Sequence, residues 1–120
     1  DTRTPMSATK ENCAEVIAAR LAEHGFEIED TEMREAHYVD ENSDFIKTLL
    51  SVYEDYSGDK GECISMGGGT YVHDIENGVA FGAISRDTVT NMHGSNEFMP
   101  IDDILTAAAI FTEVIAEICR

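Results

Sequence analysis

The residues of this chain that are best suited to chemistry lie in two polar, glycine-containing stretches. The first is Gly67-Gly68-Gly69-Thr70. Glycine has no side chain, so the backbone amides of this run can approach a carbonyl or carboxylate oxygen closely. The run lacks the Lys-Ser/Thr ending of a nucleotide phosphate loop and the spacing of a dinucleotide fingerprint. An oxygen-binding segment and a structural bend that leaves a strand both remain open as interpretations.

The second stretch surrounds His93, in the polar loop 91–97 that precedes the last predicted helix. Loops at the ends of buried strands commonly hold the ligands of α/β proteins. A neutral imidazole at this place can bind a divalent metal, with Asn96 or Glu97 orienting or completing the site. Zinc takes three or four ligands, so one histidine does not make a site, and a plain surface loop is the alternative.

Helical spacing of apolar residues predicts two helices ahead of the triple glycine. The first covers residues 8–24, with Ser7 as its cap and a left-handed Gly25 as its stop. The second covers about 45–56 and ends at Gly58.

A third helix is predicted after Pro100, with Asp102 and Asp103 at its positive N-terminal end. Each of the three helices carries one apolar stripe, which is expected to be its buried face. The stripes consist of Cys13, Val16, Ile17 and Leu21 in the first helix, Phe45, Ile46, Leu49, Leu50, Val52, Tyr53 and Tyr56 in the second, and Ile101, Ile104, Leu105, Ala108, Phe111, Ile115 and Ile118 in the third.

Strand patterns occur between the predicted helices, over residues 26–30, 62–66 and 79–82. The last of these is entered through the turn pair Asn77-Gly78. Alternating helices and strands predict an α/β or α+β fold, in which the mostly apolar strands are covered on both faces.

Charge and hydropathy exclude several classes of function. The 120 residues include 24 Asp and Glu against 8 Lys and Arg, a formal net charge of -16. Nucleic acids and anionic membranes both require a basic face, so neither is an expected partner, and no apolar run has membrane-spanning length. The 42% apolar content predicts a packed core. The three widely spaced cysteines predict reduced, buried thiols in a cytoplasmic protein.

Four motifs, in this order along the chain, resemble the C-terminal part of the dizinc aminoacylase/carnosinase-like metallopeptidases, above all their PepV-type Xaa-His dipeptidase branch. The opening 1–5, with the helix and strand after it, resembles the second half of that family's inserted lid domain. The resemblance implies an α+β lid portion at 1–38 and part of a mixed-sheet zinc-peptidase catalytic domain at 39–120. The four motifs are Met66–Tyr71, Asn77–Gly82, Met92–Phe98 and Ile101–Leu105.

The resemblance also implies roles for individual residues. His93 matches the family's last metal ligand. Arg3 matches the lid arginine that holds the C-terminal carboxylate of the substrate, a task that suits a bidentate guanidinium. The triple-glycine run matches the backbone that lines the same end of the substrate. The implied substrate-binding residues are Arg3, Gly67, Gly68, Gly69, Thr70 and Asn96.

The enzyme implied by the resemblance hydrolyses dipeptides or N-acylated amino acids with two zinc ions, or with manganese or cobalt in their place. Its other metal ligands and its glutamate base come from an N-terminal half that is not in this sequence, so no residue here is assigned as a catalytic base. Because Asp1 is preceded by no initiator methionine or leader, the chain is expected to be part of something longer. The isolated chain should be inactive and should need that half as its partner.

Two departures from the family pattern and one alternative function accompany the resemblance. Val72-His73 stands where many relatives have Ala-Arg, and the segment 83–87 stands where they have a Pro-Gly loop, which puts the local shape of the pocket in doubt. The alternative is a non-catalytic interaction domain that keeps the peptidase scaffold and associates with itself as a homo-oligomer.

Overall fold

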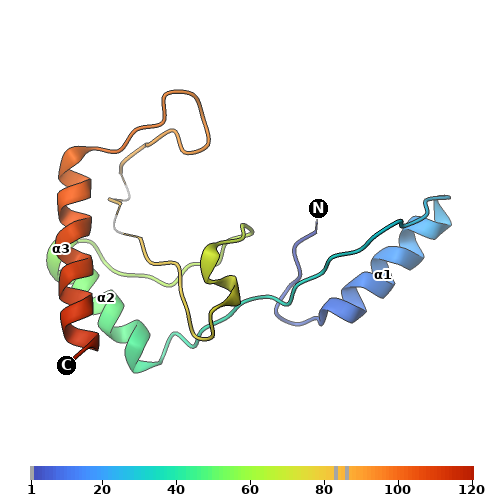
Figure 1. Cartoon of the computed structure of the whole chain (residues 1–120), viewed down its shortest axis with the longest axis horizontal. Coiled ribbons are helices and arrows are strands. Elements are labelled where there is room, and N and C mark those ends of the chain that lie inside the picture. Colours follow the sequence, from blue (N-terminus) through green and yellow to red (C-terminus); the bar gives the residue numbers. More distant parts are fainter. Residues whose placement is uncertain (1, 83, 86) are drawn as a thin grey trace. The chain divides into compact units, whose positions relative to one another are not determined.

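The structure is a computed structural model that describes residues 2–82, 84–85 and 87–120 (Figure 1). Helices joined by segments without regular structure make up this described part. The elements are α1 (Lys10–Glu23), α2 (Asp44–Ser57), the 3-10 helix η1 (Tyr71–Asp74) and α3 (Ile101–Ile118).

The chain divides into two compact units. Unit 1 contains the residues up to Tyr38 together with Gly67–Gly69, and unit 2 contains Val39–Met66 and Thr70–Arg120. The assignment of 1–38 to a lid and of 39–120 to a catalytic domain stays a prediction.

The predicted α/β fold is wrong, because residues 2–82, 84–85 and 87–120 contain no β-strand. The segments 26–30, 62–66 and 79–82 follow strand patterns, yet no described segment forms a backbone hydrogen-bond ladder with any of them. An alternating pattern specifies which side chains share a face, whereas a strand also requires a neighbouring strand to bond with. Phe26 and Ile64 are accordingly 63% and 80% exposed.

Helix α1 forms within unit 1 through local capping. The hydroxyl of Thr9 accepts a hydrogen bond from the Asn12 N–H at 3.2 Å, so Thr9 rather than the predicted Ser7 is the N-cap. The predicted stop is confirmed, since Gly25 follows the helix with φ 78°. The predicted buried face is wrong: no residue of α1 is buried, and Val16 is 62% exposed.

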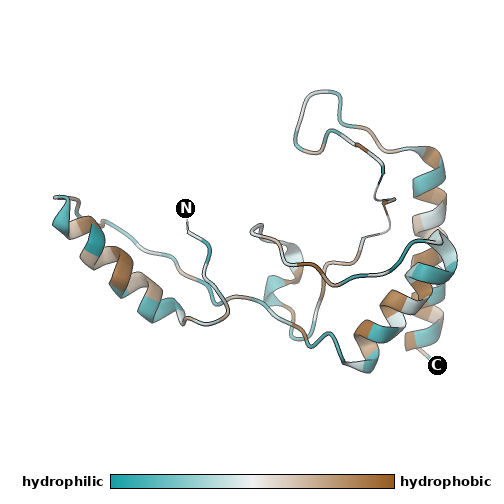
Figure 2. Cartoon of the chain, turned by 180° about the vertical axis from the view of Figure 1, so that it is seen from behind, coloured by the Kyte–Doolittle hydropathy of each residue, from teal (hydrophilic) through white to brown (hydrophobic). Residues whose placement is uncertain are grey.

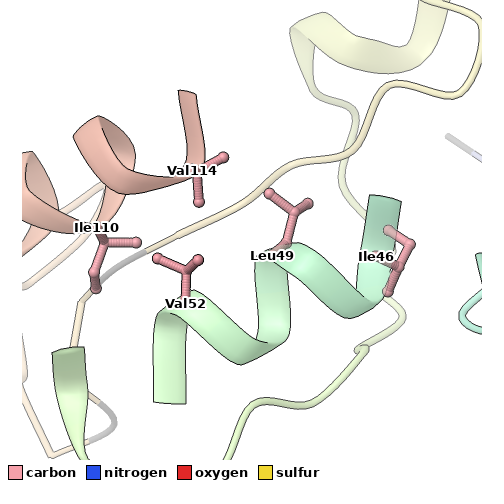
Figure 3. Close-up of a cluster of buried hydrophobic side chains, with 5 residues drawn as sticks. All are labelled: Ile46, Leu49, Val52, Ile110 and Val114. Atoms are coloured by element: carbon pink, nitrogen blue, oxygen red, sulfur yellow. The ribbon is translucent and has the colours of Figure 1, made fainter. Parts of the chain in front are cut away.

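Helices α2 and α3 pack against each other and form the core of unit 2 (Figure 3). Figure 3 shows Leu49 and Val52 of α2 pointing toward α3, beside Ile110 and Val114. The predicted α2 stripe is confirmed at its centre, where Ile46, Leu49 and Val52 are buried. The buried residues of this core are Ile46, Leu49, Val52, Ile110 and Val114.

The predicted buried face of α3 is wrong. The helix buries Ile110 and Val114 against α2, whereas Leu105, which belongs to the predicted stripe, is 63% exposed. Apolar residues recur along the whole of α3 (Figure 2), so the helix offers more than one apolar face. Helical periodicity therefore could not decide which of these faces meets α2.

A tyrosine and a glutamate lie together where α2 faces α3. The hydroxyl of Tyr56 is 3.4 Å from Oε2 of Glu113. The negative charge of Glu113 raises the pKa of Tyr56, and desolvation, the hydrogen bond and Asp55 add to this effect. Any stabilisation from this pair is complete below the ordinary tyrosine pKa of about 10 and is lost as the pH rises through the raised value.

The cysteines of the chain are unpaired and differ in exposure. Cys13, Cys63 and Cys119 are free, as expected, but the expectation of burial is wrong, because Cys13 is half-buried and Cys63 and Cys119 are exposed. None of the helices in the described part combines the length and the apolar character needed to cross a membrane.

We expect Ser43→Ala to lower the free energy of unfolding of unit 2 by about 1 kcal/mol. The Ser43 hydroxyl accepts the N–H of Ile46 at 3.3 Å and so satisfies a donor at the start of α2. Thermal unfolding followed by circular dichroism measures the change. Ser51→Ala, on the exposed side of α2, is the matched control and should change stability little. Equal effects of the two substitutions would contradict the capping role.

Candidate functional site

Arg3 lies beside the triple glycine within unit 1. Its Nε–H donates a hydrogen bond to the carbonyl oxygen of Gly67. The Arg3 side chain also runs past this residue, since its Cγ is 3.7 Å from the point where a Cβ of Gly67 would stand. The structure therefore brings together two of the groups predicted to bind substrate, the guanidinium and the glycine backbone.

Nothing inside the described chain requires glycine at Gly68 or Gly69. The backbone bends at Gly67 and Gly68, but a positive φ occurs at Gly25 and Gly58 and not in the triple-glycine run. A Cβ built on Gly68 or Gly69 would meet no atom of residues 2–82, 84–85 and 87–120 within 4 Å, apart from its neighbours along the chain. A bend that needed glycine would show a positive φ or a close backbone neighbour. Exposed, unobstructed amides are the property that these glycines provide.

Thr70 begins the part of unit 2 that follows the triple glycine. It precedes η1, and its carbonyl oxygen accepts the N–H of His73 at 3.2 Å. Its hydroxyl forms no capping hydrogen bond to η1. Thr70 and His73 are both half-buried, so His73, the departure from the family pattern, belongs to a short ordered helix.

Hydrogen bonds close the loop that carries His93, in unit 2. The Phe98 N–H donates to the Thr90 carbonyl oxygen at 3.1 Å across the base of the loop. Inside it, the Gly94 N–H donates to the Asn91 carbonyl oxygen at 2.7 Å, and Nδ2 of Asn91 donates to the Ser95 carbonyl oxygen at 3.0 Å. The loop therefore has a defined backbone path around His93.

Three residues of this loop adopt left-handed backbone conformations. The φ angles are 58° at Asn91, 63° at His93 and 56° at Asn96. Such angles cost a residue other than glycine about 1 kcal/mol or more, and asparagine and histidine are among the residues that tolerate them best. Strained backbone of this kind concentrates at functional sites. The imidazole of His93 is exposed and has no hydrogen bond or ion pair within the described part of the chain.

A side-chain contact ties the start of this region to α3. Oγ1 of Thr88 donates to Oδ2 of Asp103, in the first turn of the helix, at 2.8 Å. Sequence reasoning placed Asp103 at the helix N-terminus but missed this bond and the role of Asn91. Gly94 was the available signal, because a Cβ there would stand 3.0 Å from the Asn91 carbonyl oxygen. A glycine three residues after an asparagine is typical of such a tight turn.

The described residues contain one candidate metal ligand, His93, and no complete metal site. An exposed imidazole without a side-chain partner suits zinc, so His93 fits the predicted role. No group of three or more His, Cys, Asp or Glu residues in the described part could hold a metal ion.

The segment 83–87, which departs from the pattern of the family, includes Ala83 and Arg86, and these two residues lie outside the described residues.

A comparison with protein families and a comparison with individual proteins both match this chain to peptidases. Residues 5–117 match peptidase family M20/M25/M40. Proteins named "Putative dipeptidase" from Staphylococcus epidermidis, Staphylococcus haemolyticus and Staphylococcus aureus strain USA300 are 35%, 32% and 32% identical to the chain over 117 residues. Each match covers 98% of this chain and 25% of the relative. The chain thus spans about a quarter of the length of the curated relatives that it matches.

The match to this peptidase family covers nearly the whole chain and includes all four motifs from which the resemblance was drawn. The predicted family resemblance is therefore confirmed. The chain belongs to peptidase family M20/M25/M40.

Proposed function

We propose that this chain is the C-terminal portion of a metal-dependent dipeptidase and supplies one metal ligand together with part of the substrate-binding surface. The observation that carries the proposal is the exposed imidazole of His93, which has no partner in the described part of the chain and lies on a constrained, left-handed loop. The dipeptidase names of the relatives support this class of reaction. The free cysteines support a cytoplasmic location for the enzyme.

The substrate-binding role belongs to the group formed by Arg3 and the triple glycine. A guanidinium binds a carboxylate through charge-assisted hydrogen bonds, and exposed glycine amides donate to a carbonyl or carboxylate oxygen. A dipeptide or an N-acylated amino acid carries both kinds of acceptor at its C-terminal end. Thr70 and Asn96, in unit 2, are the further substrate-binding residues of the proposal.

The M20 family is generally metal-dependent, and we propose two zinc ions, with manganese or cobalt as other candidates. A bound divalent metal polarises a carbonyl and lowers the pKa of a water molecule. His93 would hold one ion through a ring nitrogen, and the constrained loop sets the backbone from which its side chain leaves. The other ligands and a general base would have to come from outside this chain, so the 120 residues alone are inactive.

The test compares two forms of the protein. A longer polypeptide, in which residues 1–120 are joined to the regions that the relatives possess, is assayed for dipeptide hydrolysis with zinc beside the 120-residue chain. We expect hydrolysis by the longer form alone. A longer polypeptide that folds and binds zinc but cleaves no dipeptide or N-acylated amino acid would overturn the proposal.

A second candidate is the non-catalytic interaction domain that associates with itself. The many large apolar side chains exposed in the described part favour it. Gel filtration combined with a metal measurement separates the two candidates. A metal-free dimer of the longer polypeptide would favour the interaction domain, and stoichiometric zinc would favour the enzyme.

We expect Gly68→Ala to leave the melting temperature of the 120-residue chain unchanged and to raise the KM of the longer enzyme about tenfold. The new methyl group meets no atom of the described residues within 4 Å, apart from its neighbours along the chain, so it should affect a bound ligand and not the fold. Thermal unfolding and steady-state kinetics measure the two effects. Gly82→Ala, which is also unobstructed, is the matched control for KM. An unchanged KM would remove Gly68 from the substrate-binding surface.

A further inference from the structure

The side of α3 that faces away from α2 carries a continuous apolar surface. We call it the outer stripe and define it by six exposed side chains together with Ala108. Their exposed fractions run from 42% at Phe111 to 74% at Ile101. The six are Ile101, Ile104, Leu105, Phe111, Ile115 and Ile118.

The outer stripe follows the helix along its whole length. Its members recur at intervals of three and four residues, which keeps them on one side of a helix. The core of unit 2 uses the other side, where Ile110 and Val114 are buried beside α2. A helix that is apolar on opposite sides is typical of the interior of a larger protein. The outer stripe is therefore a contact surface that no described residue of this chain covers fully.

The chemistry of the outer stripe resembles a core and not a transient binding surface. Its side chains are aliphatic or phenyl, with none of the tyrosine, tryptophan or arginine that is enriched in transient interfaces. It is also continuous with the core of unit 2, because the rings of Phe111 and Phe81 pack edge to face with centroids 5.5 Å apart. Phe81 in turn packs against the buried cluster. Permanent interfaces share this core-like composition.

The charge of the chain argues against a second copy as the covering surface. Each copy carries a formal net charge of -16. Helix α3 contributes Asp102, Asp103, Glu113 and Glu117 to this total and contains no lysine or arginine. Two copies paired through the outer stripe would bring together two chains that each carry this strongly negative net charge, and like net charges disfavour association. A neutral surface with basic residues at its edge is the better complement.

We infer that the outer stripe of α3 packs permanently against the part of an M20 polypeptide that lies outside this chain, on an apolar surface edged by lysine or arginine. The relatives provide the necessary length, since the chain corresponds to 25% of them. The inference rests on the proposed function, in which the chain works as one portion of a longer enzyme. It goes beyond that function by naming the surface through which the portions join.

The experiment measures how fast single cysteines react with a maleimide in two contexts. Cys13, Cys63 and Cys119 are first replaced with serine. The outer stripe is probed with Ile104→Cys and Ile115→Cys, in the 120-residue chain and in a longer polypeptide. The longer polypeptide is a chimera in which residues 1–120 replace the matching quarter of the Staphylococcus epidermidis relative. Lys47→Cys, on the exposed side of α2, is the control for an open surface, and Ile110→Cys is the control for a folded core.

We expect both outer-stripe cysteines to react at least about tenfold more slowly in the chimera than in the 120-residue chain, while Lys47→Cys reacts equally fast in both. Equal rates at the outer stripe, with Ile110→Cys protected in both contexts, would overturn the inference. Protection that already occurs in the 120-residue chain and increases with its concentration would identify a second copy and would also overturn it.

The same samples separate this inference from the proposed function. A chimera that protects the outer stripe but cleaves no dipeptide supports the interface and contradicts the function. A chimera that cleaves dipeptides while its outer stripe stays reactive supports the function and contradicts the interface.

Discussion

His93→Ala is expected to lower kcat/KM for dipeptide hydrolysis at least about 100-fold in the longer polypeptide and to reduce its zinc content. His93 is the only histidine in the loop 91–97, where three residues have left-handed backbone conformations. No side chain in the described part of the chain forms a hydrogen bond or ion pair with its ring nitrogens. Alanine removes the metal donor and keeps the backbone. Initial-rate kinetics and elemental analysis of the purified protein measure the two effects.

The control for this substitution is His24→Ala. His24 is also exposed, but it lies at the C-terminal end of α1 in unit 1, outside the proposed metal site. Its replacement should leave activity and zinc content within about twofold of the parent. Full activity in His93→Ala would rule out the metal-ligand role. A loss of activity at unchanged zinc content would assign His93 a role on the substrate instead.

Replacing Ile110 with alanine should lower the free energy of unfolding of unit 2 by about 2 to 5 kcal/mol. Ile110 is the one described residue whose large side chain is completely buried, at 0% exposure, and it lies in the contact between α2 and α3, beside Val52 (Figure 3). Truncation would leave a cavity among five buried residues, a core too small to absorb the loss. Urea unfolding of the 120-residue chain followed by circular dichroism measures this change.

Leu105→Ala is the matched control on the same helix. It removes a side chain of equal size from the outer stripe, where Leu105 is 63% exposed. In the 120-residue chain its effect should stay within about 0.5 kcal/mol, since little apolar surface is returned to water. A Leu105→Ala effect as large as that of Ile110→Ala would mean that α3 packs through its outer stripe and that the core described above is wrong.

Local sequence signals predicted the three long helices and the C-terminal ends of the first two well. The stops at Gly25 and Gly58 are confirmed, because glycine adopts the left-handed conformation that ends a helix without steric cost, and this preference is local. The centre of the α2 stripe is confirmed as well, since this helix has one dominant apolar face. The family resemblance was also correct from the sequence alone, because it depends on the order of short motifs and not on packing.

Signals that depend on partners were less reliable. Residues 26–30, 62–66 and 79–82 have the apolar patterns of strands but do not form strands. A strand also requires a second segment at hydrogen-bonding distance. The buried face of α1 was wrong for a related reason, because no described residue covers it fully and Cys13, Ile17 and Leu21 are only half-buried. A periodic pattern shows which residues can share a face, and burial depends on what lies opposite.

The sequence by itself determined the positions of the helices, the family of the chain and the identity of its candidate site residues, because these depend on neighbours along the chain. Only the tertiary structure decided which face of α3 meets α2, that Arg3 lies beside Gly67, and that hydrogen bonds from Asn91 and Gly94 hold the loop around His93. Arg3 and Gly67 are 64 residues apart, and no local propensity carries information over that distance. Contacts of this kind arise from packing, in which each side chain competes with every other for a small core.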